Sequence, residues 1–314
     1  MDVGLMVEGQ HDLDWERWLH ILHLAERLGF PSLFRSDHYF INDQRASLET
    51  WTSLAVAARE TSTIRFGPLV APVTFRHPVD VGRMAAQIDL LSGGRFVMGV
   101  GNGWHQPEHD AYGIPFPEPA ERAARLGEAI QLMRAMWGPG PASFEGRYYQ
   151  LRDIDVLPKP APGHPYLLVG GNGPKRTLRY AAQYADEWNT VNAPPETLAE
   201  RIAILDAHCE AIGRDPASIR KTMMTFAFVG PDDATIERNM DRFPRMAGIG
   251  ALEARKAAVR ERGQPAGGAE EVIDYLGRLA ELGISEVQFQ HLDFHDDTVP
   301  EFLASDVAPK VRGL

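Results

Sequence analysis

Short apolar segments alternate with longer segments of helical periodicity along the whole chain. Between Trp15 and Leu28, apolar side chains recur every three or four positions, Asp14 can cap the first turn, and Gly29 can end the helix. The apolar segments are rich in Val, Leu, Ile and Phe, which is typical of buried strands. We expect eight of them to be strands, at residues 2–8, 32–34, 64–71, 95–100, 166–169, 187–191, 220–229 and 287–291.

Each expected strand is followed by an expected helix, and this order predicts the fold. Parallel strands need crossover helices, and eight strand–helix units can close into a barrel whose centre is filled by side chains. A doubly wound open sheet would show the same alternation, but no glycine-rich dinucleotide fingerprint follows the first strand. We therefore expect an α/β fold, a (βα)8 TIM barrel, formed as a single domain by residues 1–314.

Three stretches depart from the alternation. Residues 144–157 are expected to form a hairpin, and the proline-rich residues 107–119 are expected to form a loop that leads to a long helix. Residues 231–268 are rich in charge and glycine and have weaker periodicity. We interpret them as an insertion after the seventh strand.

Composition and charge narrow the classes of function. The net charge of the 314 residues is −11, the pI is near 5.5 and no dense basic run occurs, so a nucleic-acid partner is not expected. The single cysteine, Cys209, cannot form an internal disulfide. The first residues lack the pattern of a signal peptide and no apolar run approaches a membrane span, so we expect a cytoplasmic protein without membrane contact.

Polar side chains follow several of the expected strands. In a barrel of this kind the loops after the strands share one face, and that face carries the active site. The residues expected there are Glu8, Asp37, His38, Leu69, Val70, Thr74, Arg76, Asn102, Trp104, His105, Trp188, Asn189, Gln290, His291 and Asp293.

A glycine-rich loop follows the fifth expected strand and precedes a helix. It contains Gly170, Gly171, Asn172 and Gly173, and Lys175 and Arg176 come directly afterwards. Glycines let backbone amides approach a ligand closely, and a helix N-terminus attracts an anion. We expect a phosphate site here. The alternative is a tight turn that needs glycine for its backbone conformation.

Other chemistry is less well supported by the residues. His105, Glu108 and His109 lie close in sequence, but their spacing does not fit the HExxH metal motif, so we expect no metal. Trp104 and Trp188 can be walls for a ring or substrate, or core residues. Neither a pair of catalytic carboxylates nor a convincing metal set is found, which argues against a phosphate-sugar binder or a barrel hydrolase that uses the same glycine loop.

Several motifs together resemble those of the bacterial-luciferase-like flavin oxidoreductases, and the resemblance covers nearly the whole chain. They are Ser36-Asp37-His38, PVTFRHP at 72–78, LSGGR at 91–95, GNGW at 101–104, FEGRYY at 144–149 and LPKP at 157–160. Within that superfamily, residues 65–113 and the string VGGNGPKRTLRYAAQYADEWN at 169–189 look most like the branch that depends on coenzyme F420.

The resemblance implies a flavin-like ring bound at the carboxyl ends of the barrel strands. Members commonly have a non-prolyl cis peptide on the third strand, which here corresponds to Leu69–Val70 or to Pro68–Leu69. Asp37 would contact the polar edge of the ring, and His38 would lie near its reactive face. Further residues implied in cofactor binding are Leu69, Val70, Thr74, Asn102, Gly103 and Trp104 around the ring and ribityl chain, and Gly170, Gly171, Asn172, Gly173, Lys175 and Arg176 around the phosphate.

The implied activity is hydride transfer between coenzyme F420 and a small organic substrate. His38 is the candidate proton partner because its ordinary pKa lies nearest neutrality, and Asp37 beside it is a second candidate catalytic residue. The resemblance implies that the insertion at 231–268 is a lid over the substrate. Phe226, Phe228, Phe243 and Met246 would give this lid an apolar lining, which indicates an apolar substrate. The alternative is an FMN-dependent monooxygenase that uses reduced flavin and O2. The resemblance also implies a homodimer formed through helices early in the chain.

Overall fold

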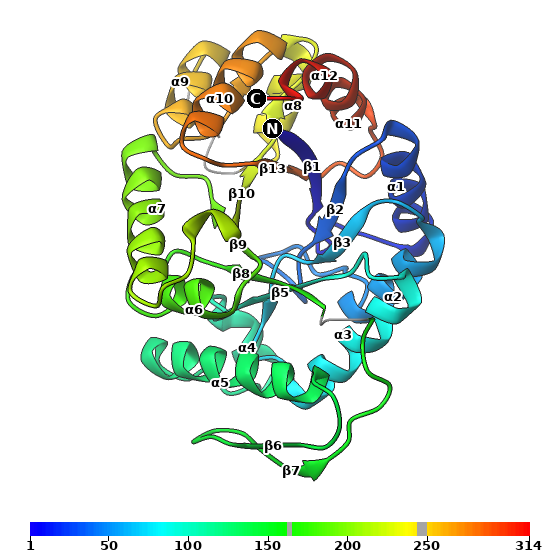
Figure 1. The fold of residues 1–314 in the computed structure, drawn as a ribbon. Coiled ribbons are helices and arrows are strands. Elements are labelled where there is room, and N and C mark those ends of the chain that lie inside the picture. The colour runs from blue at the N-terminus through cyan, green and yellow to red at the C-terminus, as the bar shows by residue number, and fades with distance from the viewer. Residues whose placement is uncertain (162–164, 244–249) are drawn as a thin grey trace.

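The computed structural model describes residues 1–161, 165–243 and 250–314, and its strands form a parallel barrel surrounded by helices (Figure 1). The strand order in the sheet is β3-β2-β1-β13-β10-β9-β8-β5-β4. The bounds are β1 Asp2–Val7, β2 Ser32–Arg35, β3 Arg65–Pro68, β4 Ala71–Pro72, β5 Val97–Gly101, β8 Tyr166–Gly170, β9 Glu187–Val191, β10 Arg220–Phe226 and β13 Glu286–His291. The expected α/β barrel is confirmed.

The third expected strand, 64–71, is interrupted in the structure. Its first half, β3, pairs with β2, and its second half, β4, pairs with β5. The bond between Leu69 and Val70, which separates the halves, is cis and is one of the two bonds expected to be so. A bridge between Phe66 and Phe96 brings β3 to the segment before β5, so that the two ends of the sheet meet.

The barrel helices follow the expected order. Asp14 caps α1 by accepting a hydrogen bond from the backbone of Arg17, and Gly29 ends the helix in the left-handed conformation at φ 75°. The helix bounds are α1 Trp15–Leu28, α2 Thr50–Glu60, α3 Pro78–Ser92, α5 Pro119–Trp137, α6 Thr177–Tyr184, α7 Pro195–Glu210, α10 Ala269–Glu281, α11 Thr298–Phe302 and α12 Ala308–Val311, with π-helical turns between the last two. Across the part of the chain that the structure describes, every helix is too short or too polar to cross a membrane.

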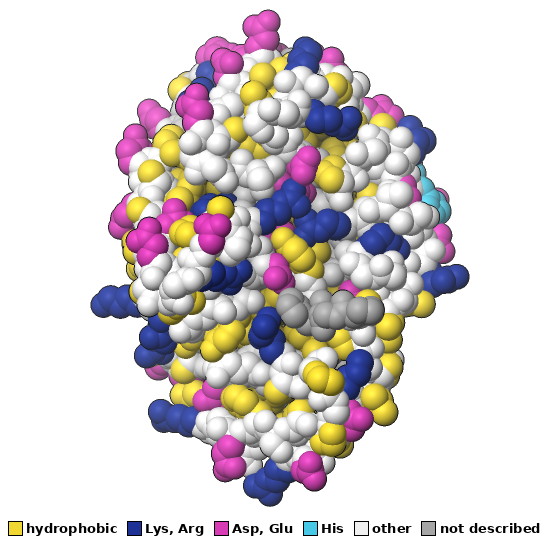
Figure 2. Space-filling view, viewed as in Figure 1, with side chains coloured by type: hydrophobic (Ala, Val, Ile, Leu, Met, Phe, Trp, Pro, Cys, Tyr) yellow, Lys and Arg dark blue, Asp and Glu magenta, His cyan; other side chains and the backbone are white. Residues whose placement is uncertain are grey.

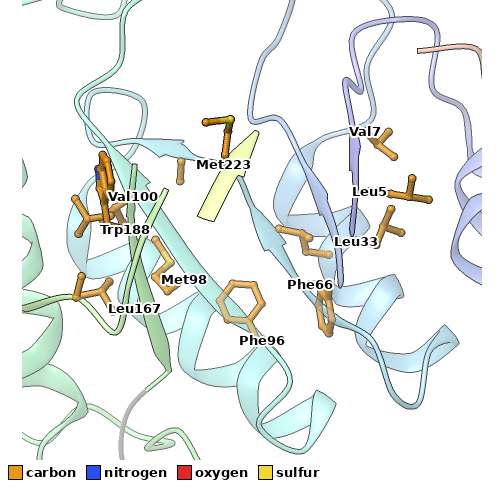
Figure 3. Packing of buried hydrophobic residues seen from close by; sticks show 14 of the residues in the cluster. Leu5, Val7, Leu33, Phe66, Phe96, Met98, Val100, Leu167, Trp188 and Met223 are labelled. Carbon is orange, nitrogen blue, oxygen red and sulfur yellow. The ribbon is translucent and has the colours of Figure 1, made fainter. Parts of the chain in front are cut away.

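Side chains on neighbouring strand positions enter different layers of the core. Leu5 of β1 belongs to the large layer between strands and helices, whereas Met6 packs inside the barrel with Phe34 and Leu168. Figure 3 shows several residues of the outer layer: Leu5, Leu33, Phe66, Phe96, Met98, Leu167, Trp188 and Met223. This alternation positions every strand end, and therefore every loop that follows it.

An ionic layer fills the barrel at the amino ends of its strands. Arg65 pairs with Glu187 at 3.0 Å, and Arg220 pairs with Glu286 at 2.9 Å, while both carboxylates are fully buried. Burial raises the pKa of Glu286, and the Arg220 charge opposes this shift. Lys and Arg side chains, with Asp and Glu among them, also lie over the centre of the barrel in the space-filling view (Figure 2).

The segment after β10 forms a small substructure with its own core. It contains α8 Asp233–Asp241 and α9 Leu252–Arg260, and β11 Phe228–Val229 pairs in parallel with β12 Ala266–Gly267. The seventh expected strand, 220–229, is therefore too long, because its last residues leave the barrel. Phe228 packs with Ile236 and Met240 instead of facing a substrate. Met246 lies outside the described residues.

Two smaller elements lie between β5 and β8. The expected hairpin is formed by β6 Ala142–Glu145 and β7 Gln150–Ile154, which project from the barrel below α5 in Figure 1. The expectation of a loop over 107–119 is wrong in its first part, because α4 spans Gln106–Tyr112. Pro107 is compatible with the first helical turn, and Gly113 at φ 67° ends the helix. These two signals are present in the sequence.

Candidate functional site

Loops from distant parts of the chain meet at the carboxyl ends of the strands. His38 follows β2 and Trp104 follows β5, and their ring centroids lie 5.6 Å apart in a T-shaped arrangement. Asn102, also after β5, donates a hydrogen bond of 3.1 Å from Nδ2 to Oγ1 of Thr177 at the start of α6. The Asp37–His38 pair and the glycine loop before α6 therefore open onto the same mouth of the barrel.

His38 is held by Glu108, a residue of α4. Its Nδ1 lies 2.8 Å from Oε2 of Glu108, whose other oxygen accepts hydrogen bonds from the backbone N–H groups of Tyr39 and Phe40. Burial of the ring disfavours its charged form, but the Glu108 hydrogen bond and nearby carboxylates outweigh burial and raise the pKa of His38. No hydrogen bond to Nε2 of His38 occurs among the described residues, so this nitrogen is left for a ligand.

Asp37 is paired with an arginine and does not contact His38 through a hydrogen bond. Its two carboxylate oxygens accept hydrogen bonds of 2.7 and 3.1 Å from Arg76, which also pairs with Glu49 at 2.9 Å. The Asp37 side chain is buried, and its charge helps to raise the pKa of Arg76 against the opposing effect of burial. This bidentate geometry fixes both side chains at the edge of the mouth.

Trp104 is the most exposed large apolar side chain at the mouth, with 65% of its surface accessible. Its ring lies 4.9 Å from the ring of His105, which in turn faces Phe40 at 6.2 Å. An exposed tryptophan beside a partly buried histidine is an apolar wall on the solvent side of a polar group.

Val70 lies against glycines of two strands. A Cβ atom built on Gly101 of β5 would lie 2.6 Å from Cγ2 of Val70, and one built on Gly170 of β8 would lie 2.8 Å from its Cγ1. Only glycine at these positions lets the Val70 side chain approach both strands. The Val70 side chain therefore packs directly against backbone atoms of β5 and β8.

The loop after β5 is tied to its neighbours by small polar side chains. Gly103 has a φ of 74°, and a Cβ there would lie 2.7 Å from Oγ1 of Thr74, which is bonded to Nε2 of His109 at 2.8 Å. Oδ1 of Asn102 is buried and has no hydrogen-bond partner in the described ranges. A buried acceptor without a partner at the mouth is a group that a ligand can satisfy.

Residues of β9 hold the glycine loop through hydrogen bonds. Trp188 is fully buried and donates a hydrogen bond of 2.9 Å to the carbonyl of Gly171, so its interpretation as a ring or substrate wall is wrong. Asn172 accepts a hydrogen bond of 2.7 Å from Thr190. Lys175 is exposed, whereas the guanidinium of Arg176 donates to the carbonyl of Ala120. The loop backbone and Lys175 remain open to an anion.

Two of the three residues considered as metal ligands have other side-chain partners. Glu108 binds His38, and His109 bonds to Thr74 and to the carbonyl of His105. Within residues 1–161, 165–243 and 250–314, no group of three or more His, Cys, Asp or Glu side chains is arranged to hold a metal.

Two features of the site were missed by sequence reasoning. One is Glu108, since a helix over 106–112 was not expected. The other is the set of hydrogen bonds around Glu8, whose Oε2 accepts from Gln10 at 2.8 Å and whose Oε1 accepts from Gln290. The proline and glycine that bound α4 are the signal that could have revealed Glu108 as a helix residue facing the mouth.

Comparison with known proteins identifies related chains. The family model described as luciferase-like monooxygenase matches residues 1–286. The F420-dependent hydroxymycolic acid dehydrogenase of Mycobacterium tuberculosis is 30% identical, over 92% of this chain and 82% of that protein. The F420-dependent glucose-6-phosphate dehydrogenase of Kineococcus radiotolerans is 29% identical, over 92% of this chain and 90% of that protein.

A solved structure shares the fold over its full length. It is an F420-dependent secondary alcohol dehydrogenase in complex with an F420-acetone adduct, with a TM-score of 0.84, 24% identity and coverage of 99% of both chains. At this identity the likeness concerns the arrangement of the barrel and its helices.

Proposed function

Since the chain belongs to the luciferase-like monooxygenase family, we propose that it is a coenzyme F420-dependent oxidoreductase acting on a small organic alcohol or its carbonyl product. The observation that carries the proposal is the His38–Glu108 pair, which leaves Nε2 of His38 open at the barrel mouth beside the exposed Trp104. The relatives named as F420-dependent dehydrogenases support this cofactor over FMN.

The residues at the mouth fit a planar ring with a phosphate tail. Val70 on its glycine support would lie beneath the ring, with Leu69 and Trp104 around it, and the Asp37–Arg76 pair would face the polar edge. Thr74, Asn102 and Gly103 would line the ribityl chain, where Oδ1 of Asn102 needs a donor. The backbone of Gly170, Gly171, Asn172 and Gly173, with Lys175, would hold the phosphate, and Arg176, whose guanidinium donates to the carbonyl of Ala120, would add positive charge beside it.

The bound deazaflavin supplies a ring carbon that accepts or donates a hydride. When an alcohol is oxidised, its carbon–hydrogen bond loses the hydride and its hydroxyl loses a proton, and Nε2 of His38 accepts that proton. Glu108 fixes the other nitrogen as the donor of the Nδ1–H hydrogen bond and stabilises the imidazolium that forms. In the reverse reaction His38 returns the proton to the carbonyl oxygen.

We also propose that the protein works as a homodimer in the cytoplasm. Leu90 and Leu91, adjacent at the end of α3, expose 44% and 43% of their surfaces. Neighbouring exposed leucines on a helix are suited to burial against a second copy.

Cofactor choice is tested by titrating the protein with coenzyme F420 and with FMN while following cofactor fluorescence. We expect binding of F420 and not of FMN, and tight FMN binding without F420 binding would overturn the assignment. The His38→Ala variant should bind F420 normally but turn over about 10²- to 10⁴-fold more slowly, because a positioned proton acceptor contributes that much. Wild-type turnover in this variant would remove His38 from the mechanism.

A further inference from the structure

A series of aromatic rings leads from His38 to the protein surface. Measured between ring centroids, His38 lies 5.6 Å from Trp104 and 6.1 Å from His105. His105 lies 6.2 Å from Phe40, and Phe40 lies 6.3 Å from Tyr112. We call Trp104, His105, Phe40 and Tyr112 the rim cluster. These separations are those of interacting aromatic pairs, so the rim cluster is continuous with the proposed proton-transfer site.

The two outer rings of the rim cluster are exposed. Trp104 and Tyr112 expose 65% and 61% of their surfaces, the two highest values among the large apolar side chains of the described residues. Phe40, which contacts Tyr112, is buried, and His105 is partly buried. An exposed apolar surface that adjoins a proton-transfer group marks a place for a ligand.

Helix α4 carries both the partner of His38 and the outermost ring of the cluster. Glu108 and Tyr112 are four positions apart in α4, which places them on the same side of the helix. Glu108 binds His38 and the backbone N–H groups of Tyr39 and Phe40, and the ring of Tyr112 lies 4.9 Å from that of Tyr39. The helix that fixes His38 therefore also places Tyr112 against the loop that carries His38.

His105 contributes a neutral ring to this surface. Its side chain makes no hydrogen bond among the described residues, and its ring lies 4.9 Å from that of Trp104. Burial lowers the pKa of His105 against the opposing charge of Glu108, so the ring is neutral at physiological pH. A neutral imidazole between aromatic rings presents a flat face to a ligand, not a charge.

The substrate is the ligand that can reach the rim cluster from the site of reaction. A substrate whose reacting carbon lies beside His38 can extend an arm over Trp104 toward Tyr112. Trp104 is also proposed to border the cofactor ring, and its large exposed surface leaves room for a substrate beside it. Aromatic pairs gain free energy beyond the burial of apolar area, so a substrate with an aromatic ring profits most from such a surface.

We propose that the rim cluster binds an aromatic ring of the substrate, so that the preferred substrates are aryl-substituted alcohols or the corresponding carbonyl compounds. A ring on a short arm would pack against Trp104, and a ring on a longer arm would reach Tyr112. The inference rests on the proposed function and names its substrate class. It keeps the apolar substrate expected from the sequence but assigns its recognition to other residues, since Phe228 is packed within the insertion.

The test compares alcohols that carry a phenyl ring with alcohols that carry a cyclohexyl ring of similar size, on arms of two to six carbons. For the F420-loaded wild-type enzyme we expect kcat/KM of the phenyl alcohol to exceed that of its cyclohexyl counterpart by roughly three- to tenfold for at least one arm length, as for one aromatic pair. Trp104→Ala should lower this ratio for short arms and Tyr112→Ala for long arms. Tyr112→Phe keeps the ring and should keep the ratio.

Because the ratio is taken within each variant, a general loss of activity cancels. The control is Ile154→Ala, which removes an exposed apolar side chain from the projecting hairpin and should leave the ratio unchanged. Failure of the proposed function would be seen separately, as absence of F420 binding in the fluorescence titration. A second readout needs no cofactor: the phenyl alcohol should raise the melting temperature of the wild-type protein more than the cyclohexyl alcohol does.

Three outcomes would overturn the proposal. One is a wild-type ratio of phenyl to cyclohexyl alcohol near one at every arm length, and another is an unchanged ratio in both Trp104→Ala and Tyr112→Ala. The third is a halved mass of Tyr112→Ala in light scattering, which would assign the exposed ring to an interface between two copies of the chain.

Discussion

At the scale of single residues, the pairing of His38 with Glu108 decides what the mouth can do chemically. The contact shifts the pKa of both residues, because the charge of each favours ionisation of the other. It raises the pKa of His38 and lowers the pKa of Glu108, although burial opposes both shifts. A buried carboxylate that stabilises an imidazolium makes the histidine a stronger proton acceptor.

This pairing predicts a change in pH dependence for Glu108→Gln. The proposed alcohol oxidation would need neutral His38, so kcat/KM of the wild-type enzyme should rise as the pH passes a pKa of His38 above its ordinary value. Removing the carboxylate removes a charge that raises this pKa, so the rise should move to lower pH, and the limiting rate should fall by roughly 10²-fold. The exposed Glu118→Gln is the control. A profile of unchanged position and height in Glu108→Gln would show that Glu108 has no part in proton transfer.

At the scale of elements, the divided third strand and its glycine neighbours shape the floor of the site. Val70 fits between β5 and β8 because Gly101 and Gly170 have no side chains. The proline and glycine residues of 67–72 made an irregular strand end predictable. The first half of this strand, β3, pairs with β2, and the second half, β4, pairs with β5. This division follows from closure of the barrel.

The Gly101→Ala substitution tests this floor. Its new Cβ would meet Cγ2 of Val70 at 2.6 Å, and displacement of Val70 should weaken F420 binding by roughly tenfold, as expected for overpacking of about 1–3 kcal/mol. The measurement is the fluorescence titration, with circular dichroism to verify the fold. Gly277→Ala in α10 is the control, since its Cβ would meet nothing within 4 Å, and it should stabilise the protein without affecting binding. Unaltered binding in Gly101→Ala would exclude Val70 from the cofactor site.

At the scale of the whole molecule, closure of the barrel brings together loops that are far apart in the chain. The segment after β10 has its own small core and is joined to the segment after β13 by ion pairs, so one side of the mouth is built from residues outside the barrel proper. Exposed apolar residues such as Leu90 and Leu91 lie on the covering helices, away from the mouth. We assign this outer surface to the proposed association of two copies.

The proposed homodimer is tested by light scattering. With a chain mass of 34.9 kDa, twice this mass, about 70 kDa, is expected in solution. The double substitution Leu90→Glu and Leu91→Glu should give a mass of about 35 kDa, because two buried charges oppose association. Ile212→Glu alters an equally exposed apolar side chain after α7, on the other side of the barrel in Figure 1, and should leave the dimer intact. A wild-type mass of 35 kDa would contradict the proposal.

The barrel was predictable because its signals are local. The alternation of strand and helix periodicities, the cap at Asp14 and the turn at Gly29 act within a few residues of one another, and their sum specifies eight strand–helix units. The order of strands around a closed sheet then places Asp37, His38 and the glycine loop at one mouth, whatever the details of packing.

The partners of the side chains were decided only by the tertiary structure. His38 meets Glu108 across 70 positions of sequence, and Gln290 meets Glu8 across 282. Trp188, next to a candidate site residue, faces the helices because neighbouring strand positions point to opposite sides of the sheet. Such contacts depend on strand register, on the divided third strand and on the helix over 106–112, and these become definite only when the barrel closes.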